Sequence, residues 1–230
     1  MEPKLDSVKR TRRYDASGRR VQARRNRESV LDAAKRRFLD DGYAGTTIAA
    51  IAREAGVSVE TVYKGFGGKS GLVRAIYERG LVGRGPIPAY QRSDEMRARE
   101  TDPRTIMREW GVLTTEVAAE VTPIRLLMRS AAATDPEMAA LLNDSDNERL
   151  ERMHHHARFL HQRGYLRDGV TVSEATDVLW TCSSVELYEL LVMKRGWPHH
   201  RFAQFVADFM ITALLPTSPR PQEGEDRTSQ

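Results

Sequence analysis

Residues 46–72, TTIAAIAREAGVSVETVYKGFGGKSGL, constrain the fold of this chain more than any other stretch. Apolar side chains follow the helical spacing i, i+3, i+4 and i+7 at Ile48, Ile51, Ala52 and Ala55. Gly56 suits the left-handed conformation that ends many helices, and Ser58 can cap the start of a second helix. Val62 and Phe66 continue the apolar face. The pattern predicts two short helices joined by a three-residue turn.

Such a helix-turn-helix places its second helix in a DNA major groove. Val59, Glu60 and Lys64 point away from the apolar face and are the candidates for reading bases. Val59 could meet a thymine methyl, Glu60 a cytosine amino group, and Lys64 a guanine edge or a phosphate. Alternatively, Glu60 only favours the N-terminus of its own helix.

Three further residues are candidates for contacts with the DNA backbone. Thr47 begins the first short helix, where its hydroxyl and the free N–H groups can meet a phosphate, or it only caps that helix. Lys69 adds a cation at the start of the next helix. Tyr63 can offer its hydroxyl to the backbone, and its ring to a sugar. A purely internal role for Tyr63 is disfavoured because Val62 and Phe66 already occupy the inward face.

This stretch resembles the DNA-binding domain of TetR-family transcriptional regulators, tightly over about residues 25–80. The matching positions are Thr47, Ile51, Ala52, Ala55, Gly56, Val57, Ser58, Thr61, Tyr63, Phe66, Lys69 and Leu72. The resemblance supports phosphate contacts by Thr47, Thr61, Tyr63 and Lys69, and it adds Ser58 to the DNA-binding candidates. Gly65 departs from the family, which often has a histidine near a phosphate there.

The distribution of charge also separates a DNA-binding front part of the chain from the rest. Residues 1–80 contain 18 Lys and Arg against 10 Asp and Glu, whereas residues 81–230 contain 18 against 22. A basic front half and a mildly acidic rear half suit a DNA-binding head on a body that stays off DNA. Residues 1–24 predict a disordered basic arm, which either follows phosphates, enters a minor groove, or has no role.

Helical patterns dominate the rest, so the predicted fold class is all-α: an N-terminal helix-turn-helix domain followed by a larger helical dimerisation and ligand-binding domain. We expect the DNA-binding domain over 25–82, a linker over 83–102, the rear domain over 103–215 and a disordered tail over 216–230. The first helix is expected over 25–41, ended by Gly42. The rear helices are expected over 103–120, 123–133, 136–142, 145–163, 173–194 and 198–215.

The last helix has a wide apolar stripe that includes Phe202, Phe205 and Phe209. This stripe either packs within one chain or forms a two-fold seam between subunits. One helix-turn-helix reads few base pairs, so a homodimer on a palindromic DNA site is expected. Family resemblance places that seam at about 173–195 and 198–215.

A ligand pocket is expected among the helices between 103 and 190. The candidate lining residues are large or polar side chains in apolar surroundings, and they are equally consistent with ordinary core packing. Glu186 either faces solvent or pairs inside. The candidates are Met107, Trp110, Met128, Trp180, Glu186 and Tyr188.

Other classes of protein are disfavoured. His154, His155 and His156 are consecutive, about 100° apart on a helix, so they do not converge on one metal ion. No phosphate loop or nucleophile elbow suggests an enzyme, and no cofactor is expected. The chain lacks an apolar run long enough for a membrane span or a signal peptide. The single cysteine, Cys182, fits the reducing cytoplasm.

The sequence therefore predicts a DNA-binding transcriptional regulator. The family resemblance implies a repressor that binds a palindromic operator. It also implies that a small molecule releases the repressor by shifting the helix over 69–82. The alternatives are a ligand-independent or activating regulator, and an architectural DNA binder without sequence preference.

Overall fold

The computed structural model describes residues 16–85 and 87–217, and every regular element in that part of the chain is a helix, as the sequence predicted. The predicted tail lies outside the described residues from residue 218 on, and the predicted arm lies outside them over residues 1–15; over residues 16–24 the prediction of a disordered arm was wrong, because these residues are helical. In chain order the elements are α1 (Ala16–Gly45), α2 (Ile48–Ala55), α3 (Val59–Phe66), α4 (Lys69–Val82), α5 (Ala89–Arg99), α6 (Pro103–Ala132), α7 (Pro136–Gln162), α8 (Val172–Cys182), α9 (Val185–Tyr188), the π-helix η1 (Glu189–Lys194) and α10 (His199–Leu214).

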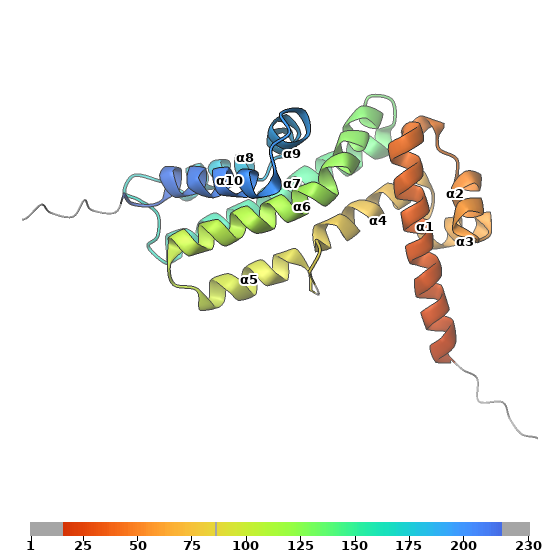
Figure 1. Cartoon of the computed structure of the whole chain (residues 1–230), viewed down its shortest axis with the longest axis horizontal. Coiled ribbons are helices and arrows are strands. Elements are labelled where there is room, and N and C mark those ends of the chain that lie inside the picture. The colour runs from red at the N-terminus through yellow and green to blue at the C-terminus, as the bar shows by residue number, and fades with distance from the viewer. Residues whose placement is uncertain (1–15, 86, 218–230) are drawn as a thin grey trace, which may run out of the picture.

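The helices form a small head and an elongated body. The head contains α1, α2 and α3, and α4 leads from it along the body, which contains α5 to α10 (Figure 1). Phe38, Ile51 and Leu72 are fully buried where α1, α2 and α4 meet. The same apolar cluster continues into α6 through Ile124 and Met128, so the head shares a core with the adjoining part of the body. The rest of the body packs around a second cluster that includes Ile106, Leu160 and Phe202.

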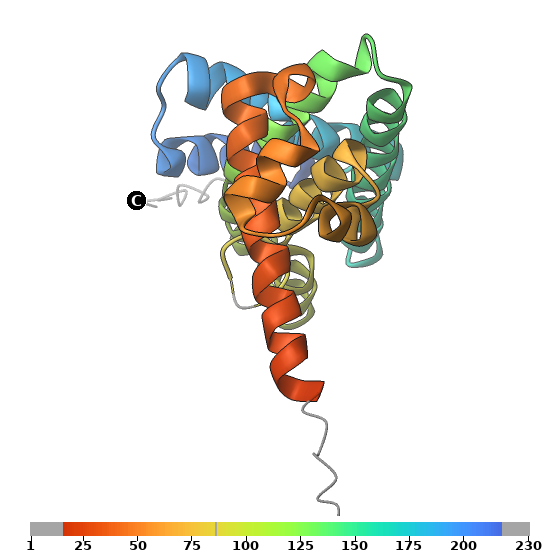
Figure 2. The ribbon, with the colours of Figure 1, turned by 90° about the vertical axis from the view of Figure 1, so that its right-hand side faces the viewer.

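Helix α1 begins nine residues before the predicted start, at Ala16 rather than residue 25. Arginine and alanine favour helix, and Gln22 donates a hydrogen bond to Asn26 one turn later, at 2.8 Å. The first turns of α1 extend well beyond the other helices of the head (Figure 2). At its other end, Gly42 has a non-helical backbone with φ of 73°, which confirms the predicted stop there.

Part of the predicted linker over 83–102 is a helix, α5. Its Ala89, Ser93 and Met96 are buried, and Trp110 of α6 donates from Nε1 to the hydroxyl of Ser93 at 2.9 Å. Gly and Pro residues between 83 and 88 made a long loop the natural expectation. In the structure the break after α4 is short. The eleven residues from Ala89 to Arg99 form a helix that packs on α6.

Two predicted breaks in the rear helices are absent. Helix α6 continues through Pro123, and α7 continues through Asn143 and Ser145. A proline removes one backbone hydrogen bond, but α6 is packed by α4, α7 and α10, which outweighs that loss. The Ser145 hydroxyl donates to the Leu142 carbonyl and accepts from Arg125, both at 2.7 Å, so its polar group is satisfied inside the helix.

One predicted helix, over 173–194, is instead divided. Helix α8 ends at Cys182, and Ser184 caps α9 by accepting from the N–H of Leu187. The chain then widens into the π-helix η1 before α10. Serine hydroxyls compete for backbone groups at caps, so the adjacent Ser183 and Ser184 allow the break.

An ion-pair cluster joins the end of α4 to α5 and α6. Glu116 of α6 accepts from Arg92 of α5 through both carboxylate oxygens, at 3.0 and 2.5 Å. It also accepts from the backbone N–H of Arg84. Nearby, Glu120 pairs with Lys35 of α1 at 3.0 Å and with Arg84 at 3.1 Å. Within this cluster, the Lys35–Glu120 pair fastens α1 of the head to α6 of the body, and the other contacts join the chain after α4 to α5 and α6.

Replacing Glu116 with glutamine should lower the free energy of unfolding at pH 7 by about 2 kcal/mol, since a hydrogen bond to a charged group contributes roughly 1.5–3 kcal/mol. The hydrogen bond from Arg92 lowers the pKa of Glu116. The contribution is therefore complete above the carboxyl's ordinary pKa and disappears as the pH falls through the lowered pKa. Urea unfolding at pH 7 and at an acidic pH below the lowered pKa of Glu116 measures this. The exposed Glu109→Gln on the same helix is the control, and an equal loss at both pH values would contradict the prediction.

Candidate functional site

The turn between α2 and α3 has the predicted capping pattern. Ser58 accepts a hydrogen bond from the N–H of Thr61 at 3.1 Å, which confirms it as the N-cap of α3. Gly56 ends α2 in the left-handed conformation, with φ of 69°. Ile51, Ala52 and Val62 are buried, as the periodicity predicted. These local contacts fix the angle at which α3 leaves the head.

The opposite face of α3 is open. Val59 is 41% exposed and Tyr63 is 52% exposed, large values for apolar and aromatic side chains. Glu60 and Lys64 are also exposed. The structure thus brings the predicted base-reading residues and Tyr63 to the outer surface of one short helix. A contact between any of them and DNA remains a prediction.

The hydroxyl groups on this surface also serve the helix starts. Thr47 accepts from the N–H of Ala50 at 3.2 Å, and the hydroxyls of Ser58 and Thr61 lie 2.8 Å apart, with either able to donate. A hydroxyl that accepts in a cap still has its proton to donate. Capping and phosphate binding by Thr47 are therefore compatible rather than alternative roles.

Lys69 lies differently from the simple cation expected at the start of α4. Its Nζ donates to the Tyr43 carbonyl at 2.5 Å and lies 4.4 Å from the centre of the Tyr43 ring. The ammonium is thus held against the end of α1. Sequence reasoning could not find this partner, because 26 residues separate the two.

Helix α1 is fastened to the helix-turn-helix unit by contacts that the sequence analysis missed. The Arg27 guanidinium lies 4.6 Å from the centre of the Phe66 ring. The Ser29 hydroxyl donates to the Ala55 carbonyl at 3.3 Å, and Glu54 pairs with both Arg36 and Arg37. The basic start of α1 consequently has a fixed position relative to α3.

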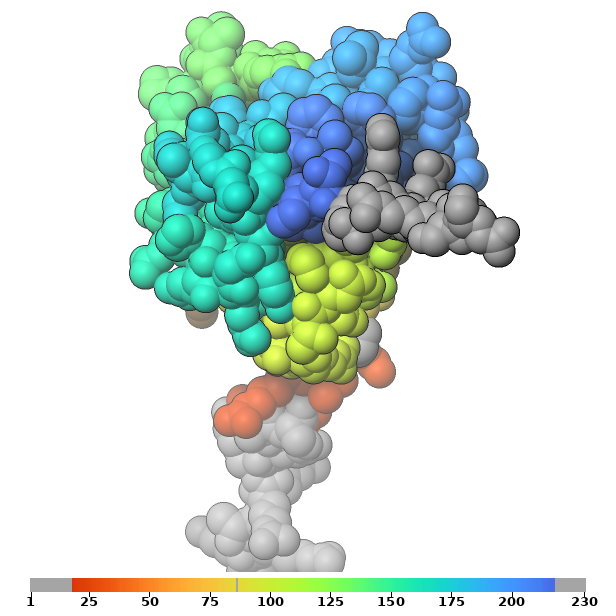
Figure 3. Space-filling model, turned by 90° about the vertical axis from the view of Figure 1, so that its left-hand side faces the viewer, coloured from red at the N-terminus to blue at the C-terminus, as the bar shows by residue number. Residues whose placement is uncertain are grey.

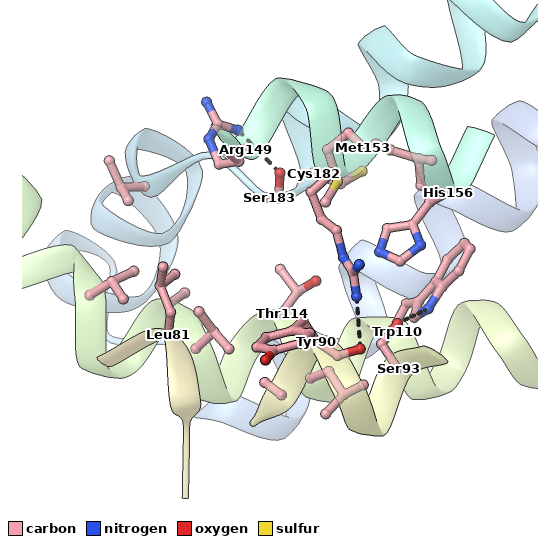
Figure 4. A pocket seen from close by; sticks show the side chains of 18 of the residues that line it. Leu81, Tyr90, Ser93, Trp110, Thr114, Arg149, Met153, His156, Cys182 and Ser183 are labelled. Atoms are coloured by element: carbon pink, nitrogen blue, oxygen red, sulfur yellow. Dashed lines mark hydrogen bonds between the residues drawn. The ribbon is translucent and has the colours of Figure 1, made fainter. Parts of the chain in front are cut away.

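A second candidate site is a partly open cavity of about 240 Å³ in the body, lined by residues of α4 to α10. Arg149 and Ser183 lie on one side of it, Leu81 and Tyr90 on the other, and His156 lies next to Trp110 at one end (Figure 4). The His156 and Trp110 ring centres are 4.5 Å apart. Most of the wall is apolar, as in pockets for small organic ligands.

Of the six predicted pocket residues, Trp110 lines this cavity and the other five do not. Met107 and Met128 are fully buried in ordinary packing. Trp180 lies under the Arg149 guanidinium, Glu186 pairs with Arg129 at 3.2 Å, and the Tyr188 hydroxyl lies 2.9 Å from His199 Nε2. Periodicity predicts which side chains point inward, but it does not tell a filled interior from a cavity.

The sequence analysis missed the polar residues of this cavity, above all Arg149, Arg152 and His156. Their spacing of i, i+3 and i+7 places all three on one face of α7, and this was the available signal. Burial lowers the pKa of His156 well below its ordinary value, with a smaller effect of Arg152, so this imidazole is neutral at pH 7.

The two sites share one helix. Tyr77 and Leu81, near the end of α4, line the cavity, and the start of α4 follows α3 directly after Gly67 and Gly68. Any ligand that moves the end of α4 therefore acts on the element that supports the exposed helix of the head.

A third feature is an apolar surface at the end of the chain. Phe205 and Phe209 on α10 are 39% and 47% exposed, with their rings stacked 6.5 Å apart. Leu190 and Met193 of η1 are more than half exposed. Atoms of α10 lie at the surface between those of α6 and α8 (Figure 3). Large exposed apolar side chains in one region are typical of a protein interface.

Within residues 16–85 and 87–217, no cluster of three or more His, Cys, Asp or Glu side chains could hold a metal ion. His154 lies 3.3 Å from the Thr176 hydroxyl, whereas His156 is buried, so the consecutive histidines point in different directions. None of the described helices combines the length and apolar content needed to span a bilayer.

Comparison with known proteins gives two kinds of match. A family model described as bacterial regulatory proteins, tetR family, matches residues 30–76. YvkB of Bacillus subtilis (strain 168), an uncharacterized HTH-type transcriptional regulator, is 40% identical over 58 residues. That match spans 25% of this chain and 31% of the length of the relative.

Solved structures resemble nearly the whole described chain. The SmeT–triclosan complex has a TM-score of 0.65 at 23% identity, covering 85% of this chain and 98% of that one. The regulator FadR from Bacillus subtilis in complex with stearoyl-CoA has a TM-score of 0.65 at 16% identity, covering 81% of this chain and 98% of that one. At these identities the likeness concerns the fold.

Proposed function

Since the chain belongs to the TetR family of bacterial regulatory proteins, we propose that it is a transcriptional repressor that binds a palindromic operator as a homodimer. The observation that carries this proposal is the outer face of α3. Val59, Tyr63 and Lys64 are exposed on a short helix whose other face is buried and whose start is capped. Such a helix fits a major groove. Catalysis has no part in the proposal, and the protein would act on DNA in the cytoplasm.

The exposed apolar surface of α10 and η1 supports the dimer. Phe205 and Phe209 would be covered by the same residues of a second copy around a two-fold axis, which is the commonest symmetry of homo-oligomers. Two heads related by such an axis match a DNA site with two related halves. The homodimer therefore accounts for both the apolar surface and the expected palindrome.

We further propose that a small molecule in the body cavity releases the operator. Tyr77 and Leu81 connect that cavity to α4, and α4 supports the head. The triclosan and stearoyl-CoA held by two similar proteins support a ligand role for the body. A ligand that favours one position of α4 would weaken DNA binding, and DNA would weaken ligand binding by the same factor.

Selection from a randomised duplex pool, with purified protein at near-physiological salt, tests the proposed function. We expect a two-fold palindrome. Tyr63→Ala should weaken binding to it about tenfold, because a backbone contact is lost in each half-site. Tyr63→Phe removes the hydroxyl but keeps the ring, and so separates the two contributions. Binding without a sequence motif, which only fades as salt rises, would contradict the proposal and indicate an architectural DNA binder.

A further inference from the structure

The cavity in the body has a wall that is mostly apolar, yet three arginines are among its lining residues, Arg125, Arg149 and Arg152. Its volume of about 240 Å³ exceeds the roughly 150 Å³ of an engineered cavity that binds benzene. The space therefore accommodates one ring or a short chain together with a polar group.

Two of these guanidinium groups share a single carboxylate. Asp146 Oδ1 lies 2.6 Å from Arg125 Nη2 and 3.4 Å from Arg149 Nη2. The side chains of Arg125 and Arg149 are only 5% and 15% exposed. A desolvated charge is costly unless it is paired. Within the described part of the chain, Asp146 is the one carboxylate in ion-pair contact with these two cations, and the charge of Glu186, which pairs with Arg129, acts on Arg149 only from a distance. Among the described residues Glu148 is the acidic member of the lining, but it is exposed and no ion pair joins it to these arginines.

Hydrogen bonding is incomplete at the same place. The Nε atoms of Arg125 and Arg149 are buried without a partner among the described atoms. The remaining donors of Arg149 reach neutral groups, the Trp180 carbonyl at 2.6 Å and the Ser183 hydroxyl at 3.1 Å. Burial and the neighbouring Arg125 lower the pKa of Arg149, which reflects the cost of keeping this charge inside.

We propose that the effector of this protein is a compact organic acid, whose carboxylate pairs with Arg149 beside Arg125 and whose aryl or alkyl body fills the apolar part of the cavity. This inference rests on the proposed role of the cavity as the effector site. The carboxylate supplies a second negative charge beside the two cations and accepts from guanidinium donors in a low-dielectric site, where charge-assisted hydrogen bonds are strong.

The position of the acid group follows from the other polar side chains. Arg152 is satisfied by Asp94 at 2.9 Å and by the Tyr90 carbonyl at 2.7 Å. His156 is buried and neutral, and its Nδ1 has no partner among the described atoms. It offers a hydrogen bond to a polar substituent of the ligand but no charge. Arg125 also lies 6.0 Å from the ring centre of Tyr77 on α4, so an anion paired here is close to the helix that supports the head.

Calorimetric titration with matched probes tests the inference. The probes are phenylalkanoic acids, from phenylacetic to 5-phenylpentanoic acid, each compared with its primary amide at pH 7.5. We expect the best acid to bind the full-length protein at least about tenfold more tightly than its amide, since a buried ion pair has no counterpart in the amide complex. Arg149→Met should remove this preference by weakening the acid while leaving the amide unchanged.

Two further variants complete the test. Arg158→Met changes an exposed arginine on the same helix and should keep the preference for acid. Arg149→Lys keeps the positive charge without the planar guanidinium group and should retain a reduced preference for the acid. This variant tests the role of Arg149 if Arg149→Met fails to fold. Equal affinities of acid and amide for the unmodified protein, including no binding by either, would overturn the inference. So would a preference that survives Arg149→Met undiminished.

These titrations use no DNA, so their result tests the acid effector separately from the proposed repressor function. A palindrome recovered by selection together with no preference for acids would overturn the acid effector alone. A preference for acids without any selected motif would overturn the repressor function and leave an acid-binding site.

Discussion

Replacing Gly71 with alanine should lower the free energy of unfolding by about 3 kcal/mol, the upper part of the range for overpacking in a well-packed site. A Cβ atom at Gly71 would lie 1.7 Å from the carbonyl oxygen of Phe66, the last residue of α3, and 2.9 Å from its carbonyl carbon. Both are backbone atoms, so the turn between α3 and α4 would have to open. DNA binding should fall with it, because α3 loses its fixed position.

Gly65→Ala is the matched control. Gly65 lies inside α3, and an added Cβ meets nothing within 4 Å. Alanine is favoured over glycine in a helix by about 1 kcal/mol, so this variant should be more stable than the original protein. Urea unfolding followed by circular dichroism compares the two. Equal stabilities of the Gly65 and Gly71 variants would show that the turn is looser than its geometry implies.

The double substitution Phe205→Glu and Phe209→Glu should convert the protein to a monomer and weaken binding to a full palindromic operator roughly 10²–10⁴-fold, the usual gain from linking two binding modules. Both rings are substantially exposed on α10, so the change should leave the fold of each subunit intact. Four carboxylates facing one another across a two-fold axis would oppose association.

Sedimentation at micromolar concentration measures the oligomeric state, and titration of a labelled operator measures the affinity. Leu39→Glu places one such carboxylate on an apolar residue of α1 with similar exposure, 43%, far from α10 in the chain, and should leave the dimer unchanged. A double variant that still sediments as a dimer would place the interface elsewhere. A monomer with undiminished affinity would show that dimerisation does not support DNA binding.

Much of the head could be predicted from the sequence because its signals are local. The cap at Ser58 and the left-handed Gly56 each act within a few residues, and the periodicity of Ile48, Ile51 and Ala52 defines the buried face of α2. The exposed face of α3 follows from the same periodicity. Errors in the element boundaries arose where tertiary packing outweighed a local signal, as at Pro123 within α6 and in the helix α5 that replaced part of a predicted linker.

The partner of Lys69 and the position of the cavity could not be predicted from local sequence signals. The sequence placed Lys69 at a helix start, but its partner Tyr43 comes from another helix. Five of the six predicted pocket residues are interior or surface residues, because an apolar side chain at an inward position looks the same whether it borders a filled core or a hollow.

The sequence by itself determined the helix-turn-helix unit, the all-α class and the division into a basic head and an acidic body, since these depend on neighbours along the chain and on composition. The tertiary structure alone decided where the cavity lies and that Arg125 and Arg149 share one carboxylate there. These residues lie on two helices, and only the packing of α6 against α7 brings their charges together out of water.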